Sequence, residues 1–215
     1  MDKNGSAVKD ILIVTLITLV AGTLLGAVYN ITKEPIAYGK QKARTESQQK
    51  VFSDAASFES AKGADDAGFA EGFEAALEEN GITGVTLNSI DCAYDKDGSG
   101  LLGYVVDITD SDGYGGDVEI MVGVRTEGDS HTVNGISFLA LSETAGMGMK
   151  AKESPFIDEF TDLAADTVIA YSKTGASAPN EIDAISGATI TTSAVTDAVN
   201  GAVIAVREYE EVMTP

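Results

Sequence analysis

Hydroxyl side chains gather in segment 183–193, which reads Asp-Ala-Ile-Ser-Gly-Ala-Thr-Ile-Thr-Thr-Ser and precedes apolar residues at helical spacing. Thr192 or Ser193 can cap that helix by accepting a backbone N–H of its first turn. The remaining hydroxyls are those of Ser186, Thr189 and Thr191. A helix N-terminus also offers free N–H groups to an anion such as a phosphate. The segment therefore predicts either a capped helix start or an anion site, and spacing alone leaves both open.

Other polar or glycine-rich patterns are simpler. Residues 113–116, Gly-Tyr-Gly-Gly, allow a backbone to approach a ligand or turn between two strands. Residues 95–100 resemble the opening of a calcium loop, but Val106 stands where a bidentate Glu is needed, so we expect a β-turn. His131 has no companion base in sequence and is expected to face solvent. Without a CxxC motif or a Cys/His cluster, the sequence predicts no metal site.

The charge distribution excludes nucleic acid as a partner. The chain has 14 basic and 34 acidic side chains. Six of the basic and three of the acidic side chains lie in residues 1–44, so the rest of the chain has a net charge of −23. Nucleic-acid affinity depends on protein cations that displace condensed counterions. The chain after residue 44 is too acidic for this and repels phosphates. The single Cys92 allows no intrachain disulfide.

Residues 11–32 carry no charge and are rich in Leu, Ile, Val and Ala. Such a run spans the ~30 Å hydrocarbon core of a bilayer as one helix. The alternative is a cleaved signal peptide, but the run exceeds the usual apolar region and no small-x-small site follows it. We therefore expect a short tail over 1–10 and an uncleaved transmembrane anchor over 11–32. Gly22 and Gly26 have GxxxG spacing, which permits helix contact in lipid but is also common by chance.

The remaining chain is expected to form a stalk or linker helix over 33–62 and a domain over 63–215. Pro35 is expected to interrupt the chain just after the anchor. Apolar spacing predicts helices over 65–80, near 155–163 and over 193–212. β-branched runs separated by turns predict an antiparallel meander with strands at 85–94, 101–108, 118–126 and 132–141, and a further strand at 167–172. The predicted class is α+β, an antiparallel sheet with packed helices, preceded by one N-terminal transmembrane helix.

The sequence Ser186-Gly-Ala-Thr189, with Asp183 upstream, resembles the flavinylation motif of the FMN-binding domain family. That family is shared by the G subunit of Rnf-type complexes and its relative in the Na⁺-translocating quinone reductase. Segments 31–36, 113–116 and 143–148 agree in order, so the resemblance spans nearly the whole chain. The family usually has Pro where Ala145 stands, which makes that loop less rigid.

The resemblance implies FMN joined to Thr189 through a phosphoester bond by a separate flavin transferase. It implies no catalytic acid or base in this chain. We expect further contacts to the cofactor, among them a hydrogen bond from Thr144, and close backbone approach at the glycines. The expected contact residues are Ser186, Gly187, Ala188, Thr191, Thr192, Gly113, Tyr114, Gly115, Glu143, Thr144, Gly146 and Gly148.

The function so implied is electron relay by a membrane flavoprotein, a subunit of an oxidoreductase complex that translocates Na⁺ or H⁺. The implied partners are integral membrane and iron–sulfur subunits, the transferase and membrane lipid. One alternative is the equivalent flavin subunit of a Na⁺-translocating quinone reductase. The other is a membrane-anchored binding or scaffold module without flavin, in which segment 183–193 merely caps a helix.

Two indicators of topology disagree. Lys33, Lys40, Lys42 and Arg44 follow the apolar run, whereas Lys3 and Lys9 precede it, so charge counting leaves the domain in the cytoplasm. The resemblance implies a cytoplasmic N-terminus and an FMN domain on the extracytoplasmic side of the cell membrane. We follow the resemblance, because long translocated domains obey charge counting poorly.

Overall fold

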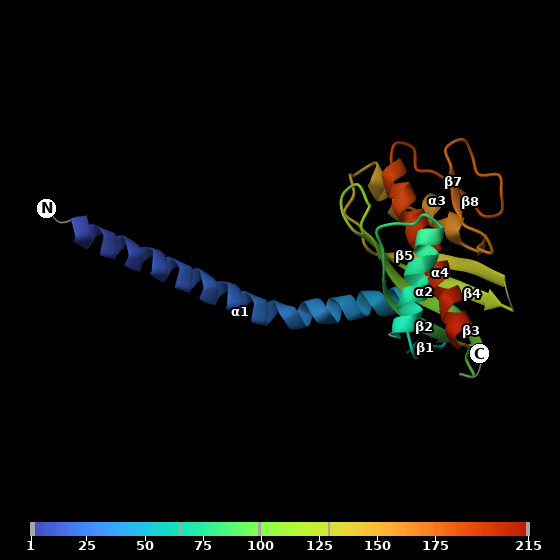
Figure 1. Ribbon diagram of the computed structural model, residues 1–215, viewed down its shortest axis with the longest axis horizontal. Coiled ribbons are helices and arrows are strands. Elements are labelled where there is room, and N and C mark those ends of the chain that lie inside the picture. The colour runs from blue at the N-terminus through green and yellow to red at the C-terminus, as the bar shows by residue number, and fades with distance from the viewer. Residues whose placement is uncertain (1–2, 65, 99, 129, 214–215) are drawn as a thin grey trace. The chain divides into compact units, whose positions relative to one another are not determined.

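The computed structural model describes residues 3–64, 66–98, 100–128 and 130–213, with side chains from Lys9 onward. The chain divides into two compact units, Met1–Arg44 and Thr45–Pro215. Helix α1 (Lys3–Val51) runs from the first unit into the second (Figure 1). The second unit holds all other helices and strands of the described residues.

The first unit is helical and exposes its apolar side chains. From Ile11 to Ile31 the large hydrophobic residues are 45–73% exposed. In water this surface would be costly, so the exposure favours a lipid environment for this part of α1. Pro35, expected to interrupt the chain, lies inside the helix instead. A second helix, Thr189–Met213, is also long and apolar enough to cross a membrane, but most of it is buried against other parts of the chain.

Six antiparallel strands form the main sheet in the order β1-β2-β3-β4-β5-β6. The sequence predicted the four central strands as a meander and did not predict the edge strands β1 and β6. Their bounds are β1 Ser57–Ser60, β2 Val85–Tyr94, β3 Leu101–Asp110, β4 Val118–Glu127, β5 Ser130–Ala140 and β6 Leu163–Ala164. The four long strands lie within two residues of the predicted ends. The class is α+β, as the sequence predicted.

Helices α2 (Ala67–Glu79) and α4 (Thr189–Met213) cover one face of the sheet. In Figure 1 α4 runs across the strands with α2 beside it, and α4 contacts β2, β3 and β4. The core between them includes Ile108, Val122 and Val199, all fully buried. Removing such apolar surface from water is the main stabilising contribution, about 25 cal/mol per Å².

The opposite face of the sheet is covered in part by the chain that leaves α1. Val51 and Phe52 pack there against Val105 and Met121, which alternate with the residues that face α4. Buried hydrogen bonds fix the same contact, with the Gln48 side-chain amide donating to Asp91 at 2.8 Å. The predicted stalk over 33–62 therefore differs from the structure, in which α1 ends at Val51 and β1 follows. The folded unit begins at Thr45 rather than residue 63.

Short elements join β5 to α4. They are the 3₁₀ helix η1 (Gly148–Lys152), α3 (Ser154–Ile157), the 3₁₀ helix η2 (Asp158–Phe160), β6, β7 (Ala170–Ser172) and β8 (Glu181–Asp183). Strands β7 and β8 pair in parallel as a separate two-stranded sheet. Asn200 of α4 binds the adjoining chain twice: its Oδ1 accepts from the N–H of Ile169 at 2.8 Å, and its Nδ2 donates to the same residue's carbonyl at 2.9 Å. This clamp ties the β7–β8 region to the core helix.

His131 was expected to face solvent, and that expectation is wrong. The residue is only 7% exposed, and its Nε2 lies 2.8 Å from Oε2 of Glu210. Glu210 is near the end of α4, far along the sequence, so the pairing arises from the packing of α4 on the sheet. A sequence pattern limited to neighbours of His131 could not show it.

Candidate functional site

The segment between β8 and α4 forms a tight loop held by backbone and hydroxyl contacts. The N–H of Ala188 donates to the carbonyl of Ile185 at 3.0 Å, and Gly187 has a φ of +80°, which suits glycine. The Oγ1 of Thr192 accepts the N–H of Ile185 at 3.1 Å and donates to the carbonyl of Ala188 at 3.0 Å. One buried hydroxyl therefore ties both sides of the loop to the first turn of α4.

Helix α4 begins at Thr189, four residues earlier than the predicted Ser193. Its hydrogen-bond ladder starts with the N–H of Thr192, which donates to the carbonyl of Ala188 at 2.9 Å. Ala188 therefore occupies the N-cap position and has no side chain that could accept a first-turn N–H. The amides of residues 189–191 precede the first helical bond, so the helix start is open to an anionic ligand.

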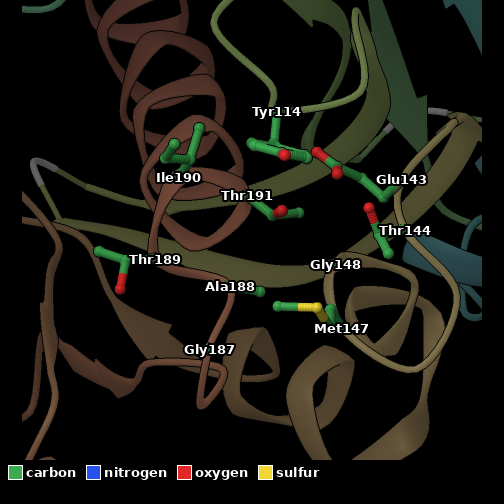
Figure 2. A pocket seen from close by; sticks show the side chains of 10 residues that line it. All are labelled: Tyr114, Glu143, Thr144, Met147, Gly148, Gly187, Ala188, Thr189, Ile190 and Thr191. Carbon is green, nitrogen blue, oxygen red and sulfur yellow. The ribbon is translucent and has the colours of Figure 1, made fainter.

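A cavity of about 390 Å³ lies beside this helix start. Its volume falls within the ~300–1,000 Å³ that is usual for small-molecule and cofactor sites. The lining residues come from the loop after β3, the loop after β5, and the start of α4 (Figure 2). They are Tyr114, Glu143, Thr144, Met147, Gly148, Gly187, Ala188, Thr189, Ile190 and Thr191.

Glycines bring the walls of the cavity close together. A Cβ atom on Gly148 would lie 2.6 Å from Oγ1 of Thr191 and 2.8 Å from Cβ of Glu143. A Cβ on Gly115 would lie 1.9 Å from the carbonyl oxygen of Ser142, so the loop after β3 rests directly on the backbone before Glu143. Real Cβ contacts are not this short, and these positions therefore require glycine.

The side chains around the cavity differ in exposure. Thr191 is 1% exposed, whereas Thr189 is half-buried at the first position of α4. In Figure 2 Thr191, Tyr114, Glu143 and Thr144 converge, and Thr189 lies apart from them. The apolar parts of Tyr114, Met147 and Ile190 are open, with exposures of 69%, 46% and 51%. The site thus has an apolar mouth and a reachable hydroxyl at its helical end.

Glu143 is the one carboxyl residue among the residues of the described chain that line the cavity. Its Oε1 is buried and has no hydrogen-bond partner in the described part of the chain. A Cβ on Gly148 would come within 2.8 Å of Oε2, and one on Gly113 within 3.5 Å of Oε1. The carboxylate therefore lies between these two glycines, and its buried oxygen is under-satisfied, which costs free energy unless something pairs with it.

Most of the predicted contact residues meet at this cavity. Eight of the residues named from the sequence line it: Tyr114, Glu143, Thr144, Gly148, Gly187, Ala188, Thr189 and Thr191. Ser186 instead lines a neighbouring cavity of about 200 Å³, and Thr192 lies beneath the helix start, fully buried. Gly113, Gly115 and Gly146 shape the adjoining loops without lining the cavity.

Two lining residues, Met147 and Ile190, were missed by sequence reasoning. Each stands next to a residue that had been selected, so their positions within segments 143–148 and 183–193 were the available signal. Here both are exposed at the mouth of a cavity.

Acidic residues lie behind the loop that carries Tyr114. Asp110, at the end of β3, is fully buried and accepts the N–H of Asp112 at 2.7 Å, while its Oδ2 has no partner among the described residues. The pKa of Asp110 is raised to about 6. Burial raises this pKa most, the hydrogen bond from the N–H of Asp112 lowers it, and the charges of Asp112 and Asp197 raise it. Burial likewise raises the pKa of Asp197 on α4.

The arrangement suits a ligand that has both a phosphate and a flat apolar ring. The uncapped helix start can receive the anion, and the side chains of Tyr114, Met147 and Ile190 offer apolar contact for a ring. Among the described lining residues there is no histidine, cysteine or lysine that would act as a base or nucleophile.

The chain is similar to known proteins over the residues that form the site. The model of the FMN-binding domain family matches residues 113–204, which include both loops and most of α4. The crystal structure of Shewanella oneidensis NqrC is 19% identical and covers 57% of this chain and 59% of its own, with a TM-score of 0.44.

Curated relatives extend the match over most of the chain. The G subunit of the Na⁺-translocating ferredoxin:NAD⁺ oxidoreductase complex of Acetobacterium woodii is 30% identical over 88% of this chain and 86% of its own length. The G subunit of the ion-translocating oxidoreductase complex of Methanosarcina acetivorans is 30% identical over 94% of this chain and 96% of its own length. The G subunit of the proton-translocating ferredoxin:NAD⁺ oxidoreductase complex of Clostridium ljungdahlii is 30% identical over 88% of this chain and 85% of its own length. On these matches the chain belongs to the family of G subunits of Rnf-type ion-translocating oxidoreductase complexes.

Proposed function

We propose that this chain carries FMN as a phosphoester on Thr189 and relays electrons within a membrane-bound, ion-translocating oxidoreductase complex. When bound, the flavin supplies the redox chemistry, and the protein supplies position and environment. The observation that carries the proposal is the half-buried hydroxyl of Thr189 at an uncapped helix start, directly beside a cavity of cofactor size.

The exposure of the two threonines favours Thr189 over Thr191 as the attachment residue. A transferase must reach the hydroxyl, and Thr191 is 1% exposed with its Oγ1 packed towards Gly148. In the proposed transfer from FAD, the threonine oxygen bonds to the FMN phosphorus as the phosphoanhydride bond breaks. AMP leaves, and the hydroxyl proton is released. The ester keeps one negative charge, which the amides of residues 189–191 are placed to stabilise.

The residues of the cavity fit the rest of the cofactor. Tyr114, Met147 and Ile190 offer apolar contact to the ring system, and Thr144 offers a hydrogen bond. Gly148 allows Thr191 and Glu143 to approach closely at the wall of the cavity. Ser186, Gly187 and Ala188 form the attachment loop. The hydroxyl of Thr192 stabilises this loop by accepting the N–H of Ile185. Gly113, Gly115 and Gly146 allow the surrounding loops their close approach.

The exposed apolar part of α1 supports a single-pass anchor in the cell membrane, with lipid as its surroundings. We place the N-terminus in the cytoplasm and the FMN domain on the extracytoplasmic side, with other integral membrane and iron–sulfur subunits as electron-transfer partners. One relative is named for Na⁺ and another for protons, both at 30% identity, so the proposal covers either coupling ion.

Two other functions are less well supported. The flavin subunit of a Na⁺-translocating quinone reductase would use the same attachment, but the three curated relatives are all G subunits. A scaffold module would need segment 183–193 only as a helix cap. The N-cap position is Ala188, which has no capping group, and the helix start borders a cavity instead.

Fluorescence of the denatured protein tests the attachment. The full chain is expressed with the transferase and separated under denaturing conditions, which retain only covalent flavin. We expect a fluorescent band for the wild type and for Thr191→Val, and none for Thr189→Val. A fluorescent Thr189→Val chain, or a dark wild type from a host with an active transferase, would refute the assignment.

A further inference from the structure

We infer that the cavity selects the neutral part of a flavin and disfavours a free terminal phosphate, so that the ester on Thr189 is what retains the cofactor. The inference rests on the proposed function and goes beyond it. It states that the unmodified chain prefers riboflavin to FMN, although FMN is the cofactor it finally carries. The preference follows from the charges around the cavity.

The described lining residues contain no lysine, arginine or histidine. Sites that hold a free phosphate usually place a cation on it, because a terminal phosphate carries about −1.5 to −2 charges at pH 7. Glu143 is the one carboxyl side chain among the described residues that line the cavity. The cavity thus presents an anion where a free nucleotide would need a counter-ion.

The surroundings add to this repulsion. Lys150 lines the neighbouring cavity, but Glu153, Glu159 and Asp183 line that cavity with it. The chain after residue 44 carries a net charge of −23. A body of this charge repels a dianion at low ionic strength, and salt screens the repulsion.

The helix start offers an attraction, but a limited one. A helix N-terminus acts as roughly half a positive charge, and no cationic side chain among the described lining residues is available to pair with the remaining phosphate charge. Esterification removes that difficulty, because the phosphodiester has one charge where the free monoester has nearly two. It also makes binding of the ring intramolecular, so a weak ring site is sufficient. The riboflavin moiety itself brings no charge and meets Tyr114, Met147 and Ile190.

The test uses the full chain with Thr189→Val in detergent, so that no ester forms, and the unmodified wild type from a host that lacks the transferase. Each is titrated with FMN and with riboflavin, followed by flavin fluorescence. We expect riboflavin to bind more tightly than FMN. Raising the salt concentration from about 20 to about 500 mM should tighten FMN binding severalfold, because salt screens the repulsion of the charged ligand. The affinity for uncharged riboflavin should change by less than about twofold.

Glu143→Gln removes one negative charge and keeps the side-chain size. It should improve FMN binding relative to riboflavin by about three- to tenfold, the effect of one charge at short range in a partly screened site. The matched control is Glu79→Gln, which changes the net charge equally at an exposed position on α2 that does not line the cavity. The control should leave the ratio of the two affinities within about twofold.

The outcomes separate the inference from the proposed function. If FMN binds more tightly than riboflavin, or if salt weakens its binding, the cavity has a phosphate-attracting group and the inference is overturned, while covalent attachment to Thr189 stands. If riboflavin does not bind the cavity at all, the inference is overturned together with the assignment of the ring site. Riboflavin binding tighter than FMN binding, with the stated salt response, supports the inference, and equal affinities for the two ligands overturn it.

Discussion

The Oγ1 of Thr192 accepts the backbone N–H of Ile185 across the loop that carries Thr189, at a distance of 3.1 Å. Both residues are buried, and the same hydroxyl donates to the carbonyl of Ala188. The proposed attachment loop is therefore fixed by a side chain that belongs to the helix itself. The loop geometry and the first turn of α4 form one unit.

Removing this hydroxyl should loosen the loop. Thr192→Val leaves the buried N–H of Ile185 without a partner, which costs about 1–3 kcal/mol of unfolding free energy. Flavin incorporation should fall as well, because Thr189 is displaced. Denaturant unfolding and fluorescence of the denatured band measure the two effects. Thr192→Ser keeps the hydroxyl and serves as control; equal behaviour of the Val and Ser variants would show that the bond is unimportant.

Adding one methyl group should obstruct the cavity. In Gly148→Ala the new Cβ would lie 2.6 Å from Oγ1 of Thr191 and 2.8 Å from Glu143. Overpacking of this kind costs about 1–3 kcal/mol, and riboflavin titration should show a correspondingly weaker affinity. Gly39→Ala is the matched control, since nothing lies within 4 Å of its new methyl group. Unchanged affinity in Gly148→Ala would mean that the ligand binds elsewhere.

Asp110 should make the domain less stable at neutral pH than at acid pH. Its pKa rises from 3.8 to about 6 on folding because the side chain is buried. A raised carboxyl pKa contributes stability that is full below pH 3.8 and is lost as the pH rises through about 6. Asp110→Asn should therefore be more stable than the wild type at pH 8, by about 1–2 kcal/mol.

Thermal unfolding at pH 4 and pH 8 measures the difference. The advantage of Asp110→Asn should shrink towards pH 4, where the wild-type side chain is neutral. Asp117→Asn, an exposed change in the same loop, should show little difference at either pH. An advantage of Asp110→Asn that grows on acidification would contradict the predicted sign.

The clamp at Asn200 should carry more stability than an exposed amide. In Asn200→Leu both backbone groups of Ile169 lose their partner in a buried position, at a cost of about 2–4 kcal/mol. Chemical denaturation measures the loss. Asn80→Leu removes an exposed bond to Ala76 at the end of α2 and should cost less than about 1 kcal/mol. Comparable losses in the two variants would argue against the clamp.

The sheet was predictable because its signals are local. β-branched alternation and glycine turns mark β2 to β5, and all four were found from sequence within two residues. Strand β1 was missed, since Ser57–Ser60 has only four residues and one large apolar side chain. Its pairing with residues 91–94 of β2 supplies what the segment itself lacks. Likewise, the pairing of His131 with Glu210 depends on tertiary packing.

The site was predictable in its segments and not in its details. The start of α4 was expected at Ser193 from the spacing of apolar residues, with a hydroxyl cap at Thr192 or Ser193 as one open alternative. The hydroxyl of Thr192 points back to Ile185 instead, and the helix begins at Thr189 with Ala188 as an inert cap. Spacing alone did not choose between Thr189 and Thr191. The resemblance favoured Thr189, and the exposures of the two side chains favour the same residue for the proposed attachment. Exposure also revealed Met147 and Ile190 at the mouth of the cavity.

The most direct test of the account is the mass of the tryptic peptide that contains Thr189. Cleavage after Lys173 and Arg207 releases residues 174–207 from the native protein, extracted from the membranes of its own cells. We predict that this peptide is heavier by the mass of FMN minus one water, and that fragmentation assigns the addition to Thr189. An unmodified peptide from cells with an active transferase, or an addition on Thr191, would contradict the central claim.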